Sequence, residues 1–298
     1  MTTSMAENNT GFQNYLEEEL EKTKGIYVPV RAGFLRRLLV RRAACKKLHP
    51  NPEDEFCSPT IGPNEGIISK YRQDFRRFGT RSSVEHDVEP LTVEKIRPSG
   101  YLILNGHHRW AAAIMTGQRS LPIHIVDLPM EEDIKKMILS SRNDRRVALD
   151  LDEVVYCSDK EPAEKPPAFP FSLRYRERIR LGIPALFHFL NKKGYDIWVY
   201  SSNYYSFTHI QKLFYLYHTH VTGIVTGAGK KSHLDTVVQE QLKKKISEHY
   251  STTIHIDGQG MIRVNSRTGE YEEYTVNGPG GEWSAHIMDL IGALDKHE

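Results

Sequence analysis

A short apolar run that ends in two closely spaced carboxylates constrains this chain more than any other feature. Residues 147–149 lead into Asp150, and a single leucine separates Asp150 from Asp152. Such a run is typical of a buried strand, and the carboxyl end of a strand is where open α/β folds bind ligands. Two carboxylates this close repel each other unless a cation lies between them, and Mg²⁺ is the natural partner of hard oxygen ligands. The sequence therefore predicts a magnesium-binding strand end.

Strands and helices alternate after this point. The pattern predicts strands at 196–200, 224–225 and 252–256, with helices at 184–193, 205–217 and 232–245. This alternation is typical of a parallel sheet with crossover helices. We expect two domains, 1–143 and 144–298.

The segment from Asp150 to Val154 resembles the first motif of the haloacid-dehalogenase (HAD) superfamily, D-x-D-x-[TV]. The resemblance implies a HAD-like Rossmannoid parallel sheet with helices on both faces. It also implies that Asp150 is the nucleophile that forms an aspartyl-phosphate. Asp152 would act as general acid and then general base, and its backbone carbonyl would bind Mg²⁺.

Three further positions follow the HAD pattern in order. Ser201, or alternatively Ser202, ends the second strand and would bind a phosphoryl oxygen. Lys230, or alternatively Lys231, would offset the phosphate charge. Asp257 follows another strand and would bind the metal together with Asp150 and Asp152. The resemblance implies a Mg²⁺-dependent phosphatase or phosphotransferase that acts on a phosphate ester.

Two features of this half depart from the common pattern or leave it open. Gly258 follows Asp257, where many HAD members carry a second acid. Metal binding is then weaker or is completed by water, and a catalytically idle domain is an alternative. The insert at 156–175 is short, which predicts an open site that admits bulky substrates.

The N-terminal half carries a second strand–turn–helix signal. It consists of Asn105, Gly106, His107, His108 and Arg109. The free amides of a helix N-terminus bind anions, and an arginine offers a planar fork for phosphate. Glycine lets a phosphate approach the backbone closely. The alternative is an ordinary helix start in which the second histidine is a cap and the arginine is solvated.

This turn resembles the G-x-x-R nucleotide-binding turn of the ParB/sulfiredoxin superfamily. The resemblance implies a small mixed α+β domain that binds ATP or ADP through residues 105–109. The turn is closest to the D-G-H-x-R of the free-serine-kinase-like branch, with Asn105 in place of aspartate. That branch uses an upstream glutamate as the base for a substrate hydroxyl, for which Glu55, then Glu53, is the candidate. The resemblance therefore implies a nucleotide-dependent small-molecule kinase, or nucleotide binding alone.

Other elements of this half follow from periodicity. We expect a disordered lead over residues 1–12, an amphipathic helix at 33–47, and helices at 67–78 and 108–116. We expect strands at 90–96, 101–104 and 121–126.

Composition limits the remaining choices. The net charge of +2 gives no general attraction to nucleic acid, although the cluster Arg36, Arg37, Arg41 and Arg42 leaves a ParB-like nucleic-acid-processing protein as an alternative. Another alternative is a phosphatase with a nucleotide-sensing domain. Three scattered cysteines and a polar start without a signal-peptide core favour a cytoplasmic setting. No apolar run suits a membrane span. We expect a small phosphate ester and a nucleotide as partners, and the oligomeric state is open.

Overall fold

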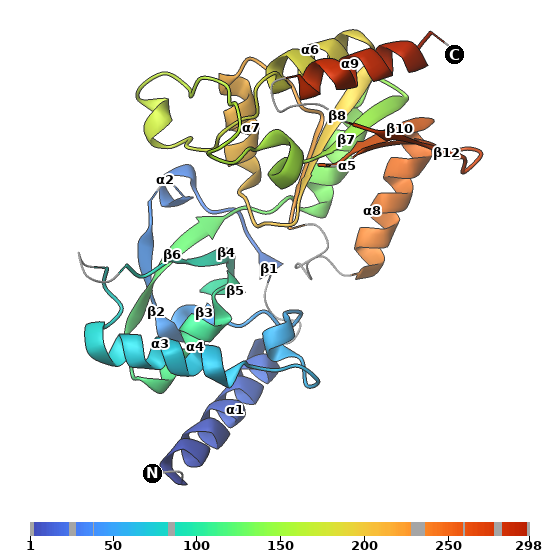
Figure 1. Ribbon diagram of the computed structural model, residues 1–298. Coiled ribbons are helices and arrows are strands. Elements are labelled where there is room, and N and C mark those ends of the chain that lie inside the picture. Colours follow the sequence, from blue (N-terminus) through green and yellow to red (C-terminus); the bar gives the residue numbers. More distant parts are fainter. Residues whose placement is uncertain are drawn as a thin grey trace. The chain divides into compact units, whose positions relative to one another are not determined.

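A computed structural model describes residues 3–23, 28–37, 39–82, 87–227, 236–258, 260–276 and 282–296 (Figure 1). Within these residues the chain divides into two compact units, a front unit that ends at Asp127 and a back unit that begins at Leu128. The division lies before the expected boundary between residues 143 and 144. The reason is helix α5 (Glu131–Ser140), which packs against α8 and β9 of the back unit.

The front unit is built on one mixed sheet. Its strands are β1 (Val28–Pro29), β2 (Arg41–Ala44), β3 (Leu48–His49), β4 (Leu91–Arg97), β5 (Tyr101–Asn105) and β6 (Ser120–Val126). The order is β2-β6-β4-β5-β3, and β1 pairs with β4. Helices α3 (Glu65–Phe78) and α4 (His107–Met115) pack against each other. The predictions for these two helices and for β4, β5 and β6 are confirmed within one or two residues.

Two predictions for the front unit are wrong. Residues 33–47 do not form one helix. They form the short helix α2 (Phe34–Arg37) and the strand β2, which pairs antiparallel with β6. Leu35 and Leu39, which a helix would have buried, are 77% and 69% exposed. Pairing with a neighbouring strand outweighs the local helical periodicity here.

The expected disordered lead is helical instead. Helix α1 spans Thr3–Thr23. Phe12 and Leu16, one helical turn apart, are buried. The ring of Phe12 contacts the indole of Trp110 at a centroid distance of 5.9 Å. This apolar contact attaches the C-terminal part of α1 to the front core.

The back unit contains a second sheet, whose order is β12-β11-β10-β7-β8-β9. Its strands are β7 (Arg145–Asp150), β8 (Tyr195–Ser201), β9 (Gly223–Thr226), β10 (Thr252–Ile256), β11 (Gly260–Asn265) and β12 (Tyr271–Thr275). Strands β10, β7, β8 and β9 are parallel, as predicted. Strands β11 and β12 add an antiparallel edge that the sequence reading did not include.

Helices cover both faces of this sheet (Figure 1). One face packs against α6 (Ile183–Lys192), α7 (Phe207–Leu216) and α9 (Trp283–Leu294), and the other against α5 and α8 (Thr236–His249). Successive side chains of β8 point to opposite faces of the sheet. Ile197 and Val199 pack in the core on the side of α6, α7 and α9, and Trp198 packs in the core on the side of α5 and α8. The back unit is therefore a three-layer α/β arrangement. None of the described helices is both long and apolar enough to cross a membrane.

Candidate functional sites

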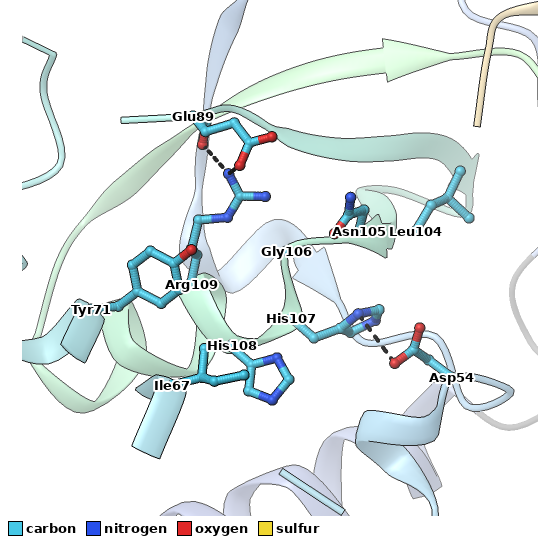
Figure 2. A pocket seen from close by; sticks show the side chains of 10 residues that line it. All are labelled: Asp54, Ile67, Tyr71, Glu89, Leu104, Asn105, Gly106, His107, His108 and Arg109. Carbon is cyan, nitrogen blue, oxygen red and sulfur yellow. Dashed lines mark hydrogen bonds and ion pairs between the residues drawn. The ribbon is translucent and has the colours of Figure 1, made fainter. Parts of the chain in front are cut away.

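The front unit holds a cavity of about 340 Å³ at the turn between β5 and α4 (Figure 2). All five residues predicted to bind a nucleotide line it. They are Asn105, Gly106, His107, His108 and Arg109. The other lining residues are Asp54, Ile67, Tyr71, Glu89 and Leu104. The five residues of the predicted strand–turn–helix signal therefore lie around one cavity.

Gly106 makes the turn possible. Its φ of 103° lies in the left-handed region, where a side chain is strained. A Cβ at this position would stand 3.0 Å from both the Arg109 guanidinium and the Leu91 side chain. Helix α4 starts at the next residue, so its first amides, which have no intrahelical partner, open beside the cavity. The turn has the geometry of an open helix N-terminus, and only glycine permits it.

His107 is a neutral, fixed side chain. Its Nε2 accepts a hydrogen bond from the backbone amide of Asn51 at 3.2 Å, so the neutral ring carries its proton on Nδ1. That nitrogen faces Oδ1 of Asp54 at 3.6 Å (Figure 2). Burial lowers the pKa of His107 to about 4, although the charge of Asp54 opposes the shift.

His108 is half-buried and is also held by the neighbouring loop. Its Nε2 accepts a hydrogen bond from the backbone amide of Asn64 at 3.1 Å. Burial lowers its pKa, again against the charge of Asp54. Two neutral imidazoles thus line the cavity, and each carries its proton on Nδ1.

Arg109 is anchored at the mouth of the cavity. Its Nη1 donates to the Glu89 carbonyl at 2.6 Å and lies 2.7 Å from the Glu89 carboxylate (Figure 2). The arginine side chain is buried, whereas that of Glu89 is 75% exposed. The carboxylate is therefore free to be displaced by another anion without disturbing the backbone contact.

The loop that contains Glu53, Asp54 and Glu55 places a different acid at the cavity from the one predicted as base. Asp54 lines the cavity, and Glu53 and Glu55 are exposed and do not. Asp54 is fixed by an Asx turn, in which Oδ1 accepts a hydrogen bond from the Phe56 amide at 2.9 Å. Three consecutive acids are alike in a sequence, and only the fold selects the one that faces His107.

The back unit brings its predicted residues to one sheet edge. Asp150 is paired with Tyr200 of β8, so Ser201 lies one residue further along that strand. Leu149 is paired with Ile256 of β10, so Asp150 and Asp257 both follow this pair. The register therefore sets the carboxyl ends of β7, β8 and β10 side by side.

Asp150 ends β7 and starts a single π-helical turn at residues 151–155. Its Oδ1 accepts hydrogen bonds from the amides of Asp152 and Glu153, both at 2.8 Å. No described residue donates a hydrogen bond to its other oxygen. The Arg180 guanidinium donates hydrogen bonds to the carbonyls of Glu153 and Val154 in this turn. The carboxylate is thus oriented by the backbone and keeps one oxygen available.

Asp152 is held by two hydroxyl groups. Ser201 donates to Oδ2 at 2.6 Å, and Tyr205 donates to Oδ1 at 3.0 Å. Ser201 also accepts a hydrogen bond from the Asn203 amide. The alternative Ser202 is exposed. Burial and the charge of Asp152 raise the pKa of Tyr205, which keeps it a proton donor to the carboxylate.

A carboxylate that the sequence reading did not include lies near Asp257. The Oε2 of Glu153 stands 3.5 Å from the point where a Cβ on Gly258 would lie. Asp257 itself accepts a hydrogen bond from the Gly260 amide at 2.8 Å. An acid from another element therefore lies beside Gly258, the position where many HAD members carry a second acid.

The predicted lysine and the predicted metal ligands do not complete a site among the described residues. Lys230 and its alternative Lys231 lie outside the described residues. Across the described parts of the chain, no three carboxylate, imidazole or thiol side chains converge into a ready-made metal site. Asp150, Asp152 and Asp257 share a sheet edge but do not form such a cluster.

Comparisons with known proteins concern the front half. The ParB N-terminal domain family matches residues 81–142, which include the β5–α4 turn. No curated protein matches the chain. Among solved structures, the C-terminally truncated chromosome-partitioning protein ParB from Caulobacter crescentus, complexed to the centromeric parS site, matches with 23% identity and a TM-score of 0.22. The match covers 35% of this chain and 51% of that one, so this chain spans about half of its length.

Proposed function

We propose that the protein is a two-domain phosphotransfer protein whose back unit hydrolyses phosphate monoesters and whose front unit binds a nucleotide. The observation that carries the first part is the pair of aspartates at the end of β7. Asp150 offers one free carboxylate oxygen, and two hydroxyl donors fix Asp152 next to it. An oriented nucleophile with a positioned proton-transfer group is the arrangement that phosphoryl transfer needs.

The reaction would proceed in two steps, formation of an aspartyl-phosphate and its hydrolysis. The free oxygen of Asp150 attacks phosphorus, and the bond to the ester oxygen breaks. Asp152 gives a proton to that departing oxygen and then takes one from a water molecule. The water attacks the aspartyl-phosphate, which releases inorganic phosphate and restores Asp150. Ser201 lies one residue beyond the strand position paired with Asp150. With substrate bound, its hydroxyl would turn from Asp152 to a phosphoryl oxygen, while Tyr205 keeps its hydrogen bond to Asp152. Lys230 would offset the phosphate charge, as the HAD resemblance implies.

The donor set fits a magnesium ion in its chemistry. Asp150 and Asp257 follow paired residues of neighbouring parallel strands, and both offer the hard oxygens that Mg²⁺ prefers. The backbone carbonyl of Asp152 is the expected third ligand, and Glu153 lies near Asp257. With so few carboxylates, water would complete the shell. Bound there, the ion would offset the negative charge of the phosphate.

The front cavity supports nucleotide binding by its own chemistry. It combines the N-terminus of α4, two imidazoles and a buried arginine. We propose that ATP or ADP places its phosphates against this helix end and that Arg109 exchanges the Glu89 carboxylate for a phosphate. If the front unit is also a kinase, Asp54 would be the base for a substrate hydroxyl, in place of the predicted Glu55.

Hydrolysis of p-nitrophenyl phosphate with Mg²⁺ tests the back unit. We expect activity in the wild type and in Asp159→Asn, whose side chain is 96% exposed, and none in Asp150→Asn. A phosphorylated Asp150 found by mass spectrometry after an acid quench would support the covalent step. Equal activity in all three proteins would reject Asp150 as nucleophile.

Calorimetric titration with ATP and ADP tests the front unit. We expect binding in the wild type and its loss in Gly106→Ala, where a side chain would crowd Arg109. Phosphorus NMR with ATP and pooled hydroxy compounds then separates the alternatives. A new ester that accumulates in Asp150→Asn and disappears in Asp54→Asn would identify a kinase, whereas binding without transfer would identify a sensor. Absence of binding in the wild type would reject both.

A further inference from the structure

A second hollow in the front unit is lined by arginines. It has a volume of about 340 Å³ and shares no lining residue with the cavity at Gly106. Arg42, Arg81 and Arg119 line it together with Phe78, and no aspartate or glutamate does so among the described residues. Arg42 belongs to the arginine cluster noted in the sequence, whereas Arg81 and Arg119 lie outside that cluster.

Arg42 is the fixed cation of this hollow. Its Nη1 donates to the Thr80 carbonyl at 2.6 Å, and its Nη2 donates to the Thr80 hydroxyl and the Ser120 carbonyl, both at 2.7 Å. Its Nε donates to the Ser120 hydroxyl at 3.1 Å. All four contacts are to neutral oxygens. The guanidinium is therefore held in place, and no carboxylate of the described residues forms an ion pair with it.

Arg81 and Arg119 supply two more charges. Both side chains are exposed, and neither forms an ion pair with a described residue. The backbone of Arg119 is fixed, because its carbonyl accepts a hydrogen bond from the Cys45 amide at 3.1 Å. Burial, and then the charge of Arg81, lower the pKa of Arg42, as expected for like charges close together.

The positive charge continues along the end of α3. Arg76 and Arg77 lie in its last turn and are exposed. The Arg77 guanidinium lies over the ring of Phe78, 4.8 Å from its centroid. Three arginines thus line the hollow together with Phe78, and a fourth, Arg77, lies over the ring of Phe78.

We propose that this arginine hollow binds a phosphate group, with Arg42 as a fixed charge and Arg81 and Arg119 as the groups that close on the anion. Unopposed like charges repel, and a bound anion relieves that repulsion. The planar fork of guanidinium matches the oxygens of phosphate better than any other common anion-binding side chain does. The phosphate belongs either to a nucleic-acid backbone or to a small phosphorylated molecule.

The test compares two double variants of equal charge change in the full chain. Arg81→Gln/Arg119→Gln removes the two free guanidiniums, and Lys46→Gln/Arg97→Gln removes two exposed charges elsewhere on the front unit. Binding of a short fluorescein-labelled single-stranded oligonucleotide is followed by anisotropy, and binding of pyrophosphate by calorimetry. For whichever ligand binds, we expect about tenfold weaker binding in the first variant and little change in the second.

The two ligands separate the two sources of phosphate. Binding of the oligonucleotide alone would identify a nucleic-acid backbone. In that case the slope of log affinity against log salt should become shallower by about 0.7 for each lost phosphate contact. Binding of pyrophosphate that also displaces the oligonucleotide would identify a small phosphate ligand. Gly106→Ala removes phosphate binding at the other cavity, so the comparison is repeated in that background, where the difference between the two double variants should persist. Equal affinities in the two double variants, or no binding of either ligand to the wild type, would overturn the proposal.

Discussion

The Ser201 hydroxyl donates a 2.6 Å hydrogen bond to Oδ2 of Asp152, although the two residues are 49 positions apart in the chain. The bond joins the ends of β7 and β8. It also leaves Tyr205 as the donor to the other oxygen of the same carboxylate. The orientation of Asp152 therefore depends on two separable hydroxyl groups.

Tyr205→Phe removes one of these donors and keeps the ring. If the back unit is a phosphatase, we expect kcat to fall about tenfold to a hundredfold with little change in KM, because a hydrogen bond to a charged group is worth roughly 1.5–3 kcal/mol. Tyr215→Phe is the control, because that side chain lies on α7 and is 68% exposed. Steady-state kinetics on p-nitrophenyl phosphate measure both. An unchanged kcat in Tyr205→Phe would mean that this bond does not serve catalysis.

Glu153→Gln should weaken magnesium binding. The Glu153 carboxylate lies beside Gly258, next to the proposed ligand Asp257. Loss of a charge close to a metal ligand commonly costs about tenfold in affinity. We expect the Mg²⁺ concentration that gives half of the maximal increase in melting temperature to rise by about that factor, with Asp159→Asn unchanged. The same Mg²⁺ dependence in Glu153→Gln and wild type would exclude Glu153 from the metal environment.

His107 makes stability depend on pH. Burial lowers its pKa to about 4 in the folded protein, against about 6.5 in an unfolded chain. Between these values the unfolded state binds the proton and the folded state does not. Stability is therefore complete above about pH 6.5 and decreases as the pH falls toward 4.

The matched variants for this effect are His107→Gln and His188→Gln, the latter on the exposed side of α6. Urea unfolding at several pH values should show a smaller loss of stability on acidification in His107→Gln than in the other two proteins. Parallel curves for all three would show that another group carries the acid sensitivity.

Two glycines of the back unit should respond in opposite ways to alanine. A Cβ on Gly223 in β9 would overlap the indole of Trp198, which is fully buried and donates to the Tyr250 hydroxyl at 2.9 Å. We expect Gly223→Ala to lose about 1–3 kcal/mol of unfolding free energy. A Cβ on Gly292 in α9 would reach ordinary contact with Phe189 at 3.9 Å. Gly292→Ala should gain about 0.5 kcal/mol, because alanine favours helix. Chemical denaturation measures both, and similar values would contradict the packing at Trp198.

The parallel strands of the back sheet could be predicted well from the sequence, because the same pattern of an apolar run followed by a polar residue recurs in each of them. Each parallel strand is a short apolar run that ends at a polar residue, and the crossover helices separate these runs. Asp150, Ser201 and Asp257 could therefore be assigned to one edge before any contact was known. The edge strands β11 and β12 are half-exposed or exposed at most positions, so they lack this apolar signal.

Side-chain choices within a loop could not be predicted. Asp54 and Glu55 differ by one position, and the Asx turn at Asp54 directs only that residue toward His107. Glu153 lies beside Gly258, which comes from another part of the chain. Strand β2 depends on pairing with β6, which local periodicity does not contain. A distant partner decides the outcome at β2, whereas at Asp54 a turn of two residues does so.

The edge strand β12 has a consequence for self-association. It ends the back sheet, and its Glu272 and Glu273 are exposed, with Arg263 of β11 beside Glu272. A second copy that added a strand at this edge would bring the same pair of acids close to these. Like charges at an open edge oppose such sheet extension, as in many natural β proteins. The acidic hairpin thus protects the back unit against edge-to-edge aggregation.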